Sequence, residues 1–225
     1  MTSGGYSQLV LSYHDVCLRR SDLDLLVAPR WLNDQIISFF FEYLEHQVVQ
    51  SLGLSDSISL VSPETVQLIK FADKSTLHAI ADSLHWQRKV LIIFAINDSA
   101  SATTAGGTHW SLLAFCRRPR PHFVHFDSMN SAVNLSVSKE IARYTLPLFV
   151  KCESPTLRFQ NGACVQQSNG YDCGVYVILN AEALINHFSQ FQELTQSILT
   201  LSETPDKKRQ SLRELILKIS EQNRS

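Results

Sequence analysis

A mostly apolar run, Val175–Ile185, constrains the fold most, because it is long enough to form a helix buried in a core. The preceding segment, Gln166–Gly170, holds polar and turn-favouring residues, so we expect a loop there. Asp172 is a suitable N-cap, since its carboxylate can accept amide hydrogens of the first turn, and Cys173 then begins the helix. The partial positive charge of a helix N-terminus favours a thiolate, and Gly174 would let a substrate backbone approach the sulfur. Cys173 is therefore the candidate nucleophile.

Length and composition indicate one ordinary globular domain over residues 1–225, with residues 1–8 expected to be flexible. The net charge of −1 gives no general attraction to nucleic acid or acidic membranes, and we expect neither as a partner. The longest apolar run, Val90–Ile96, is too short to cross a bilayer, and the first residues do not read as a secretory signal. The five scattered cysteines include no Cys-x-x-Cys pair, which favours a reducing compartment, so we expect the cytoplasm, the nucleus or both.

Hydrophobic periodicity and capping residues predict helices first, then strands, then helices again. Asn33 and Ser62 are the expected caps of the first two helices, the second of which begins at Pro63. Helices are expected at 31–51, from 63, and at 73–84, 139–150 (interrupted near Pro147), 173–185, 189–201 and from 205; strands at 9–13, 89–97, 109–116, 122–127 and 156–160; loops at 21–29 and 98–108. This order predicts an α+β fold with one central sheet.

An activated cysteine needs a general base and an orienting group. His109 begins one predicted strand and Asp127 ends another, and strand ends beside loops are where rigid scaffolds present polar groups. His125 shares a strand face with Asp127, so spacing alone leaves both His109 and His125 open as the base.

Two other interpretations of these residues need no thiol chemistry. A cysteine at the start of a buried helix is most often a small buried hydrophobe. A metal site from Cys116, His122 and His125 is possible on residue types, but the spacing fits no common zinc pattern.

Three motifs resemble the Ulp/SENP (sentrin-specific) cysteine proteases: Gln167 with Asn169–Gly174, His109–Leu112, and Trp31–Asp34. Their order along the chain also matches, and the resemblance runs from about Leu9 to the last helix. The stretches 95–98, 105–112, 10–13 and 62–64 look most like the deneddylase branch, as does the lack of a long N-terminal extension. The segment Gln167–Cys173, by contrast, resembles the SUMO-protease branch more closely in sequence.

The resemblance implies a papain-like fold of the Ulp type, with a central mixed β-sheet flanked by helices. It implies Cys173 as nucleophile, His109 as general base and acid, Asp127 as the orienter of His109, and Gln167 as an oxyanion donor. It implies that Trp31 and Trp110 wall a narrow tunnel for a Gly-Gly terminus. It implies that Asp34 meets a basic residue of the bound tail and that Asn97 also binds the substrate. The 98–108 loop would become ordered on the bound substrate.

The implied function is a deneddylase: it processes the Gly-Gly terminus of the neddylation modifier precursor and releases the modifier from lysines of targets such as cullins. The mechanism needs no metal and no organic cofactor, and the fold resemblance suggests a monomer. Two alternatives stay open. One is a SUMO-specific or ubiquitin-cross-reactive protease of the same fold, and the other is an inactive module that binds a ubiquitin-like tail.

Overall fold

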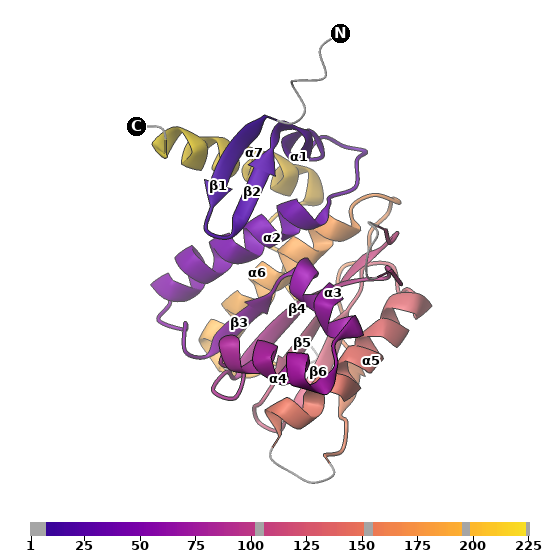
Figure 1. Ribbon diagram of the computed structural model, residues 1–225. Coiled ribbons are helices and arrows are strands. Elements are labelled where there is room, and N and C mark those ends of the chain that lie inside the picture. The colour runs from indigo at the N-terminus through magenta and orange to yellow at the C-terminus, as the bar shows by residue number, and fades with distance from the viewer. Residues whose placement is uncertain (1–7, 102–105, 151–154, 195–198, 224–225) are drawn as a thin grey trace.

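A five-stranded mixed sheet forms the centre of the protein (Figure 1). The computed structural model describes residues 8–101, 106–150, 155–194 and 199–223. The strands are β3 (Ile58–Val61), β4 (Leu91–Asn97), β5 (Trp110–Cys116), β6 (His122–Phe126) and β7 (Phe159–Asn161), in that spatial order. The pairs β4–β5 and β5–β6 are antiparallel, whereas β3–β4 and β6–β7 are parallel. The predicted α+β class with a central mixed sheet is confirmed.

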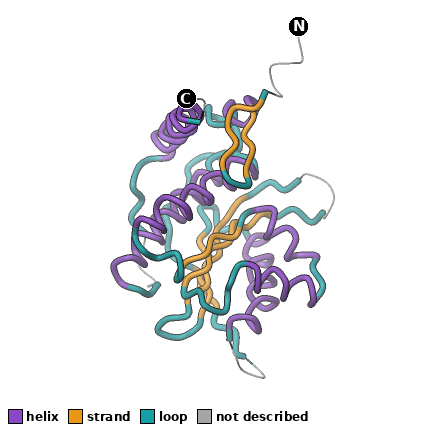
Figure 2. The backbone as a smooth tube through the Cα atoms, turned by 60° about the vertical axis from the view of Figure 1, so that its left-hand side comes forward, coloured by secondary structure: helices purple, strands orange, loops and turns teal. Residues whose placement is uncertain are grey.

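Helices cover both faces of the sheet (Figures 1 and 2). They are α1 (Arg20–Asp24), α2 (Asp34–Tyr43), which continues as the π-helix η1 (Leu44–Val49), α3 (Pro63–Phe71), α4 (Lys74–Ser83), α5 (Ala132–Phe149), α6 (Cys173–Phe191) and α7 (Pro205–Gln222). Helices α2 and α6 lie against one face, and α3, α4 and α5 cover the other. A separate hairpin of β1 (Leu9–Tyr13) and β2 (Val16–Arg19) packs on α2 and α7, beyond the α2–α6 layer.

Strand β4 joins the two halves of the core, as its apolar run predicts. Leu91, Ile93 and Ala95 belong to the cluster on the α2–α6 side. The alternate residues, Ile92, Phe94 and Ile96, belong to the cluster under α3, α4 and α5. All six are fully buried, because successive side chains of a strand point to opposite faces and both faces are covered.

The helix starts follow local capping chemistry. The Asn33 side chain accepts a hydrogen bond from the Ile36 amide at 3.2 Å, and Ser62 accepts one from the Thr65 amide at 3.3 Å. Pro63 occupies the first turn of α3, where a missing N–H costs nothing. These predicted helix starts are confirmed, and α7 also begins at the predicted position.

Several expected boundaries are wrong. Helix α5 begins seven residues before the expected position, capped by Ser131, and it continues past Pro147, which lies in its last turn. A separate helix was expected at 189–201. Helix α6 instead extends to Phe191, and the described residues after it, 192–194 and 199–201, are not helical. Residues 195–198 lie outside the described part of the chain. The short elements β2, α1 and β3 were not predicted, and β7 occupies 159–161 rather than 156–160. Elements this short hold too few residues for a clear period, and tertiary contacts decide them.

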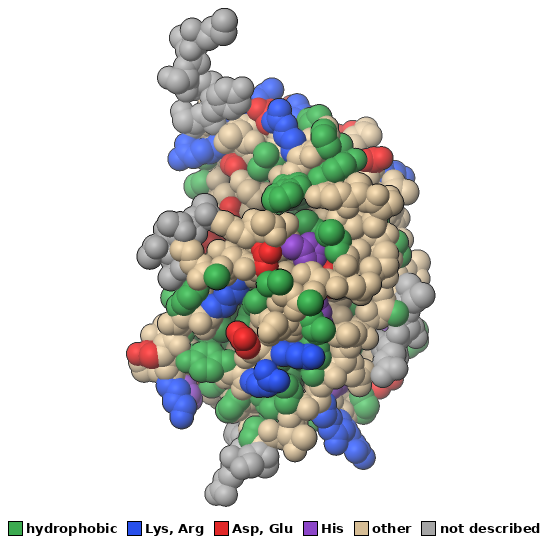
Figure 3. Space-filling model, turned by 90° about the vertical axis from the view of Figure 1, so that its right-hand side faces the viewer, with side chains coloured by type: hydrophobic (Ala, Val, Ile, Leu, Met, Phe, Trp, Pro, Cys, Tyr) green, Lys and Arg blue, Asp and Glu red, His purple; other side chains and the backbone are tan. Residues whose placement is uncertain are grey.

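The surface agrees with the near-neutral charge. On the face shown in Figure 3, basic and acidic side chains form small separate groups rather than one broad patch. Among the described residues, no helix is both long and apolar enough to span a bilayer.

Candidate active site

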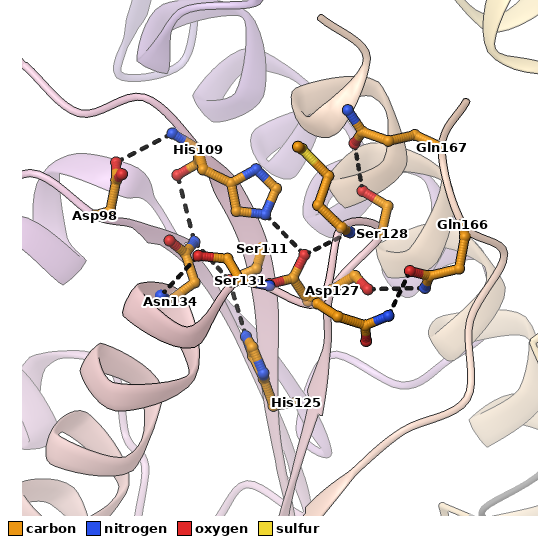
Figure 4. A network of polar contacts seen from close by, with 12 residues as sticks. Asp98, His109, Ser111, His125, Asp127, Ser128, Ser131, Asn134, Gln166 and Gln167 are labelled. Carbon is orange, nitrogen blue, oxygen red and sulfur yellow. Dashed lines mark hydrogen bonds and ion pairs between the residues drawn. The ribbon is translucent and has the colours of Figure 1, made fainter. Parts of the chain in front are cut away.

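The sheet topology brings His109 and Asp127 together. Strands β5 and β6 are antiparallel with Leu112 opposite Phe126, so the start of β5 and the end of β6 lie at the same edge of the sheet. His109 Nε2 lies 2.7 Å from Asp127 Oδ1, and both side chains are buried, at 6% and 5% exposure (Figure 4). The two residues expected to act as base and orienter are therefore paired.

Asp127 is held as a carboxylate by more than the histidine. Its Oδ1 also accepts from the Met129 amide at 2.8 Å, and its Oδ2 accepts from the Ser131 amide at 2.9 Å. Burial alone would raise the pKa of Asp127, but the bonds from His109 and these amides hold the pKa below its usual value. The carboxylate therefore stays charged and fixed in direction beside the imidazole.

The environment of His109 favours the imidazolium form. Burial opposes a charge on the ring, but the Asp127 carboxylate and the Cys173 side chain outweigh it and raise the pKa of His109 to about 9. Nε2 is engaged by Asp127, and Nδ1 is buried without a hydrogen-bond partner among the described residues. Because Cys173 is the other side chain acting on this ring, Nδ1 is the nitrogen left to exchange a proton at the sulfur.

Cys173 is the first residue of α6, as predicted, and its side chain is buried at 3% exposure. The expected capping bond from Asp172 is wrong: its side chain makes no cap hydrogen bond. Instead its Oδ1 accepts from Arg209 Nε at 2.9 Å and Nη2 at 2.7 Å, and its Oδ2 accepts from Asn169 Nδ2 at 2.7 Å. The Asp172 carboxylate therefore binds a charged guanidinium and a side-chain amide instead of the first N–H groups of α6.

Gly174 has a packing role that the sequence did not indicate. A Cβ atom at this position would lie 2.9 Å from Leu32 Cβ and 3.5 Å from Trp110 Cδ1. The missing side chain therefore lets α6 approach the Trp31–Asp34 segment and Trp110. Close packing of the scaffold is thus a further reason for glycine at this position, and the expected space for a substrate backbone stays a prediction.

Gln167 lies in the loop before α6, anchored on the segment after β6. The backbone N–H of Gln167 donates to the Ser128 carbonyl at 2.9 Å. The side-chain Oε1 of Gln167 accepts from Ser128 Oγ at 2.7 Å (Figure 4). Its Nε2 donates to the Asn169 carbonyl at 2.6 Å. A side-chain amide has two N–H groups, so a second donor remains beyond this bond, and the expected oxyanion role of Gln167 stays a prediction.

Cys173 lines a cleft of about 700 Å³. It brings together the four residues expected to bind substrate, Trp31, Asp34, Asn97 and Trp110, with parts of α3 and the loop after β4. Trp31 is 49% exposed, and its Nε1 donates to the Gly170 carbonyl at 2.8 Å. Trp110 Nε1 donates to the Leu32 carbonyl at 3.1 Å. Each indole is thus fixed by its backbone partner, which gives the cleft rigid aromatic walls.

Asn97 and Asp98 support the segment that carries His109. Asn97 Nδ2 donates to the His109 carbonyl at 3.4 Å, and Gly107 (φ 92°) sits so close that a Cβ there would collide with the Asn97 side chain. Asp98 accepts from the amides of Thr108 at 2.6 Å and His109 at 3.0 Å. Asn97 therefore lines the cleft and also positions His109, and the supporting role of Asp98 was not predicted.

The rival base and the alternative metal site are resolved by geometry. His125 Nε2 lies 2.9 Å from Ser111 Oγ (Figure 4), and burial lowers the pKa of His125 to about 4, so the ring is neutral and is bonded to Ser111 rather than to Asp127. Cys116 and His122 contact the backbone carbonyls of Arg118 and Arg120. Within the part of the chain that the structure describes, these residues form no group able to hold a metal.

Sequence reasoning missed two supporting residues. Asn134 of α5 is fully buried and donates to Ser111 Oγ at 2.9 Å and to the His109 carbonyl at 3.3 Å. Arg209 of α7 binds Asp172 and also the carbonyls of Leu25 and Arg30. Arg209 follows two lysines in a segment typical of a solvated helix face, so no local pattern distinguishes it.

A thiol at a helix N-terminus, a cationic histidine beside it and a buried carboxylate behind the histidine define the class of cysteine proteases. The fold is similar to that of a solved structure. The solved structure of the C-terminal Ulp1 protease domain in complex with Smt3, the yeast ortholog of SUMO, superposes with a TM-score of 0.67 over 96% of this chain and 90% of that chain, at 18% identity.

The chain belongs to the Ulp1 protease family, because the family's C-terminal catalytic domain matches residues 30–222. It is 40% identical over 194 residues to "Sentrin-specific protease 8" of Homo sapiens, which covers 86% of this chain and 88% of the relative. It is 35% identical over 182 residues to "NEDD8-specific protease 1" of Arabidopsis thaliana, covering 80% and 76%. The family expected from the three motifs is confirmed, and the chain is a cysteine protease.

Proposed function

We propose that this protease is a deneddylase, which cleaves the bond after the Gly-Gly terminus of the neddylation modifier. The observation that carries the proposal is the cleft lined by Trp31, Trp110 and Cys173, with the His109–Asp127 pair acting on that cysteine. A Gly-Gly tail is an extended backbone without side chains, which suits a cleft lined by two fixed indoles. The names of the relatives at 35–40% identity favour the neddylation modifier over other ubiquitin-like proteins.

In the proposed mechanism, Cys173 is the nucleophile. The partial positive charge at the start of α6 and the His109 imidazolium stabilise the thiolate. The thiolate attacks the carbonyl carbon of the terminal glycine, and the resulting oxyanion accepts hydrogen bonds from the Gln167 side chain and the Cys173 amide.

His109 then serves both half-reactions. Its Nδ1–H protonates the leaving amine, the C–N bond breaks, and a thioester to Cys173 remains. His109, now neutral, removes a proton from water, and the hydroxide hydrolyses the thioester and regenerates the thiolate–imidazolium pair. Asp127 accepts from Nε2–H throughout, which holds the tautomer in which Nδ1 faces the sulfur.

The test is the reaction of the purified protein with C-terminal electrophile probes built on the neddylation modifier, SUMO and ubiquitin. We expect selective adduct with the first probe, lost in Cys173→Ala and retained in Cys17→Ala, which removes an exposed thiol elsewhere. Adduct mainly with the SUMO probe would keep the mechanism and overturn the substrate. No adduct with any probe from folded protein would overturn the enzyme assignment of the site in favour of a binding module.

We further propose that isopeptide-linked conjugates, cullins among them, are substrates as well as the precursor. The leaving group in both cases is an amine protonated by His109, so the site needs no separate machinery for a lysine side chain. Release of free modifier from a purified neddylated cullin supports the proposal, and cleavage of the precursor alone would refute it.

A further inference from the structure

Three potential metal ligands converge on the side of the molecule that carries the β1–β2 hairpin. His14 lies in the turn of the hairpin, and Glu42 and His46 lie on the α2–η1 helix. One ligand atom from each lies within 4.8 Å of the others. Within the described part of the chain, this is the sole group of three or more histidine, cysteine or acidic side chains that is placed to hold a metal ion. None of the three belongs to the catalytic site.

The helix supplies two ligands in a ready geometry. Glu42 and His46 are four residues apart, a spacing that puts both side chains on one helix face. His46 Nε2 lies 3.2 Å from Glu42 Oε2. Two ligands bound at about 2.0–2.1 Å to one tetrahedral zinc ion are about 3.3–3.4 Å apart, so this pair already has the separation that such an ion needs.

The third ligand comes from a turn with an unusual backbone. His14 has a φ of 47°, in the left-handed region that glycine adopts most readily and that few other residues occupy. The centroids of the His14 and His46 rings lie 3.6 Å apart, and the two ring planes are 12° from parallel. A rotation of the exposed His14 side chain would turn its nitrogen lone pair toward the other two ligands. A less strained residue could form the turn but could not provide this nitrogen.

The electrostatic surroundings favour a bound cation. Burial, assisted by the nearby Asp15 carboxylate, raises the pKa of Glu42, while His46 and His14 oppose the rise. Burial raises the pKa of Glu45 as well, and Glu42 adds to the rise. The Glu42 carboxylate thus lies near those of Asp15 and Glu45, so a divalent ion bound by Glu42 would relieve the repulsion between them.

We propose that His14, Glu42 and His46 form a binding site for a borderline transition-metal ion such as Zn²⁺, which fastens the β1–β2 hairpin to α2 and η1. Two imidazoles and one carboxylate are donors that zinc accepts, whereas Mg²⁺ and Ca²⁺ prefer oxygen ligands. A fourth position is left for water. An isolated two-stranded hairpin is marginally stable, so an ion shared between its turn and the helix would restrict its opening.

The proposal is tested by calorimetric titration with Zn²⁺ alone, and with Mg²⁺ as the counter-probe, in Cys173→Ala protein. This background is needed because the catalytic thiol and His109 are zinc ligands themselves. We expect one Zn²⁺ per chain at this site and no saturable Mg²⁺ binding. Loss of a ligand in His14→Gly, Glu42→Gln or His46→Ala should weaken the Zn²⁺ affinity by at least about 10-fold to 100-fold.

A second histidine provides a matched control. His85 is also exposed and has a φ of 51°, so His85→Gly relieves the same backbone strain as His14→Gly without removing a proposed ligand. His85→Gly should leave zinc affinity unchanged. Amide hydrogen exchange should show that Zn²⁺ slows exchange in Leu9–Arg19 of the protein with His14 but not in His14→Gly. Equal zinc affinity in His14→Gly and His85→Gly, absence of saturable binding, or unchanged hairpin exchange would each overturn the proposal.

Discussion

Replacement of Arg209 by methionine tests whether a remote helix holds the catalytic cysteine in place. The Arg209 guanidinium is 3% exposed and makes two hydrogen bonds to Asp172, the residue before the nucleophile. It also donates to the carbonyls of Leu25, Arg30 and Tyr171 at 2.9, 2.8 and 3.2 Å. One side chain thus joins α7 to the start of α6 and to the segment that leads into Trp31.

Arg209→Met should be strongly destabilising, because methionine fills similar space but leaves a buried carboxylate without its cation. Removal of one partner of a buried ion pair costs about 3–5 kcal/mol. With a urea m-value of about 3 kcal/mol/M, at the upper end of the range for small proteins, the unfolding midpoint should fall by roughly 1–1.7 M. The double variant Arg209→Met/Asp172→Asn removes the orphaned charge, so it should recover part of this loss.

The assay is urea unfolding followed by tryptophan fluorescence, together with kcat/KM on a fluorogenic modifier substrate. Lys218→Met is the matched control, since it removes a cation from an exposed position of the same helix and should change stability by no more than about 0.5 kcal/mol. We also expect lower kcat in Arg209→Met under conditions where the protein is folded. A stability loss below about 1 kcal/mol, or no recovery in the double variant, would refute the reasoning.

Three further predictions concern the site. The alkaline limb of kcat/KM should lie near pH 9, where His109 loses its proton, and Asp127→Asn should move it to lower pH. Gln167→Ala should lower kcat by about 10²-fold with little change in KM, as measured by steady-state kinetics. A rise in KM with unchanged kcat would contradict an oxyanion role. The contributions of His109 and His125 to the free energy of unfolding should depend on pH in opposite directions. Urea unfolding at several pH values measures both. The pKa of His109 is raised, so its contribution is complete below its unfolded pKa of about 6.5 and is lost as pH rises through 9. The pKa of His125 is lowered, so its contribution is present above about 6.5 and is lost as pH falls through 4, by up to roughly 3 kcal/mol. His125→Gln should remove the acid slope but keep activity; a large loss of activity would reopen His125 as a base.

Local sequence patterns predicted the parts of this protein that depend on local physics. The near-continuous apolar run of β4 predicted a strand buried on both faces, and Asn33 and Ser62 predicted the starts of α2 and α3. Cys173 was predicted at the start of α6 because a polar loop precedes a long apolar run. Capping bonds and side-chain periodicity act within a few residues, so they are legible without knowledge of the fold.

Only the tertiary structure decided which polar groups meet. His109 and His125 were equal candidates by spacing, and the packing of β5 beside β6 gave the first Asp127 as its partner and the second Ser111. Asp172 was a reasonable cap by position, but Arg209, 37 residues later, took its carboxylate. Such contacts follow from how distant elements pack, and a charged side chain has the same local pattern whether it lies in solvent or in a buried pair. The sequence by itself therefore determined the secondary structure around the nucleophile and the family, whereas tertiary packing decided how the catalytic groups are paired and held.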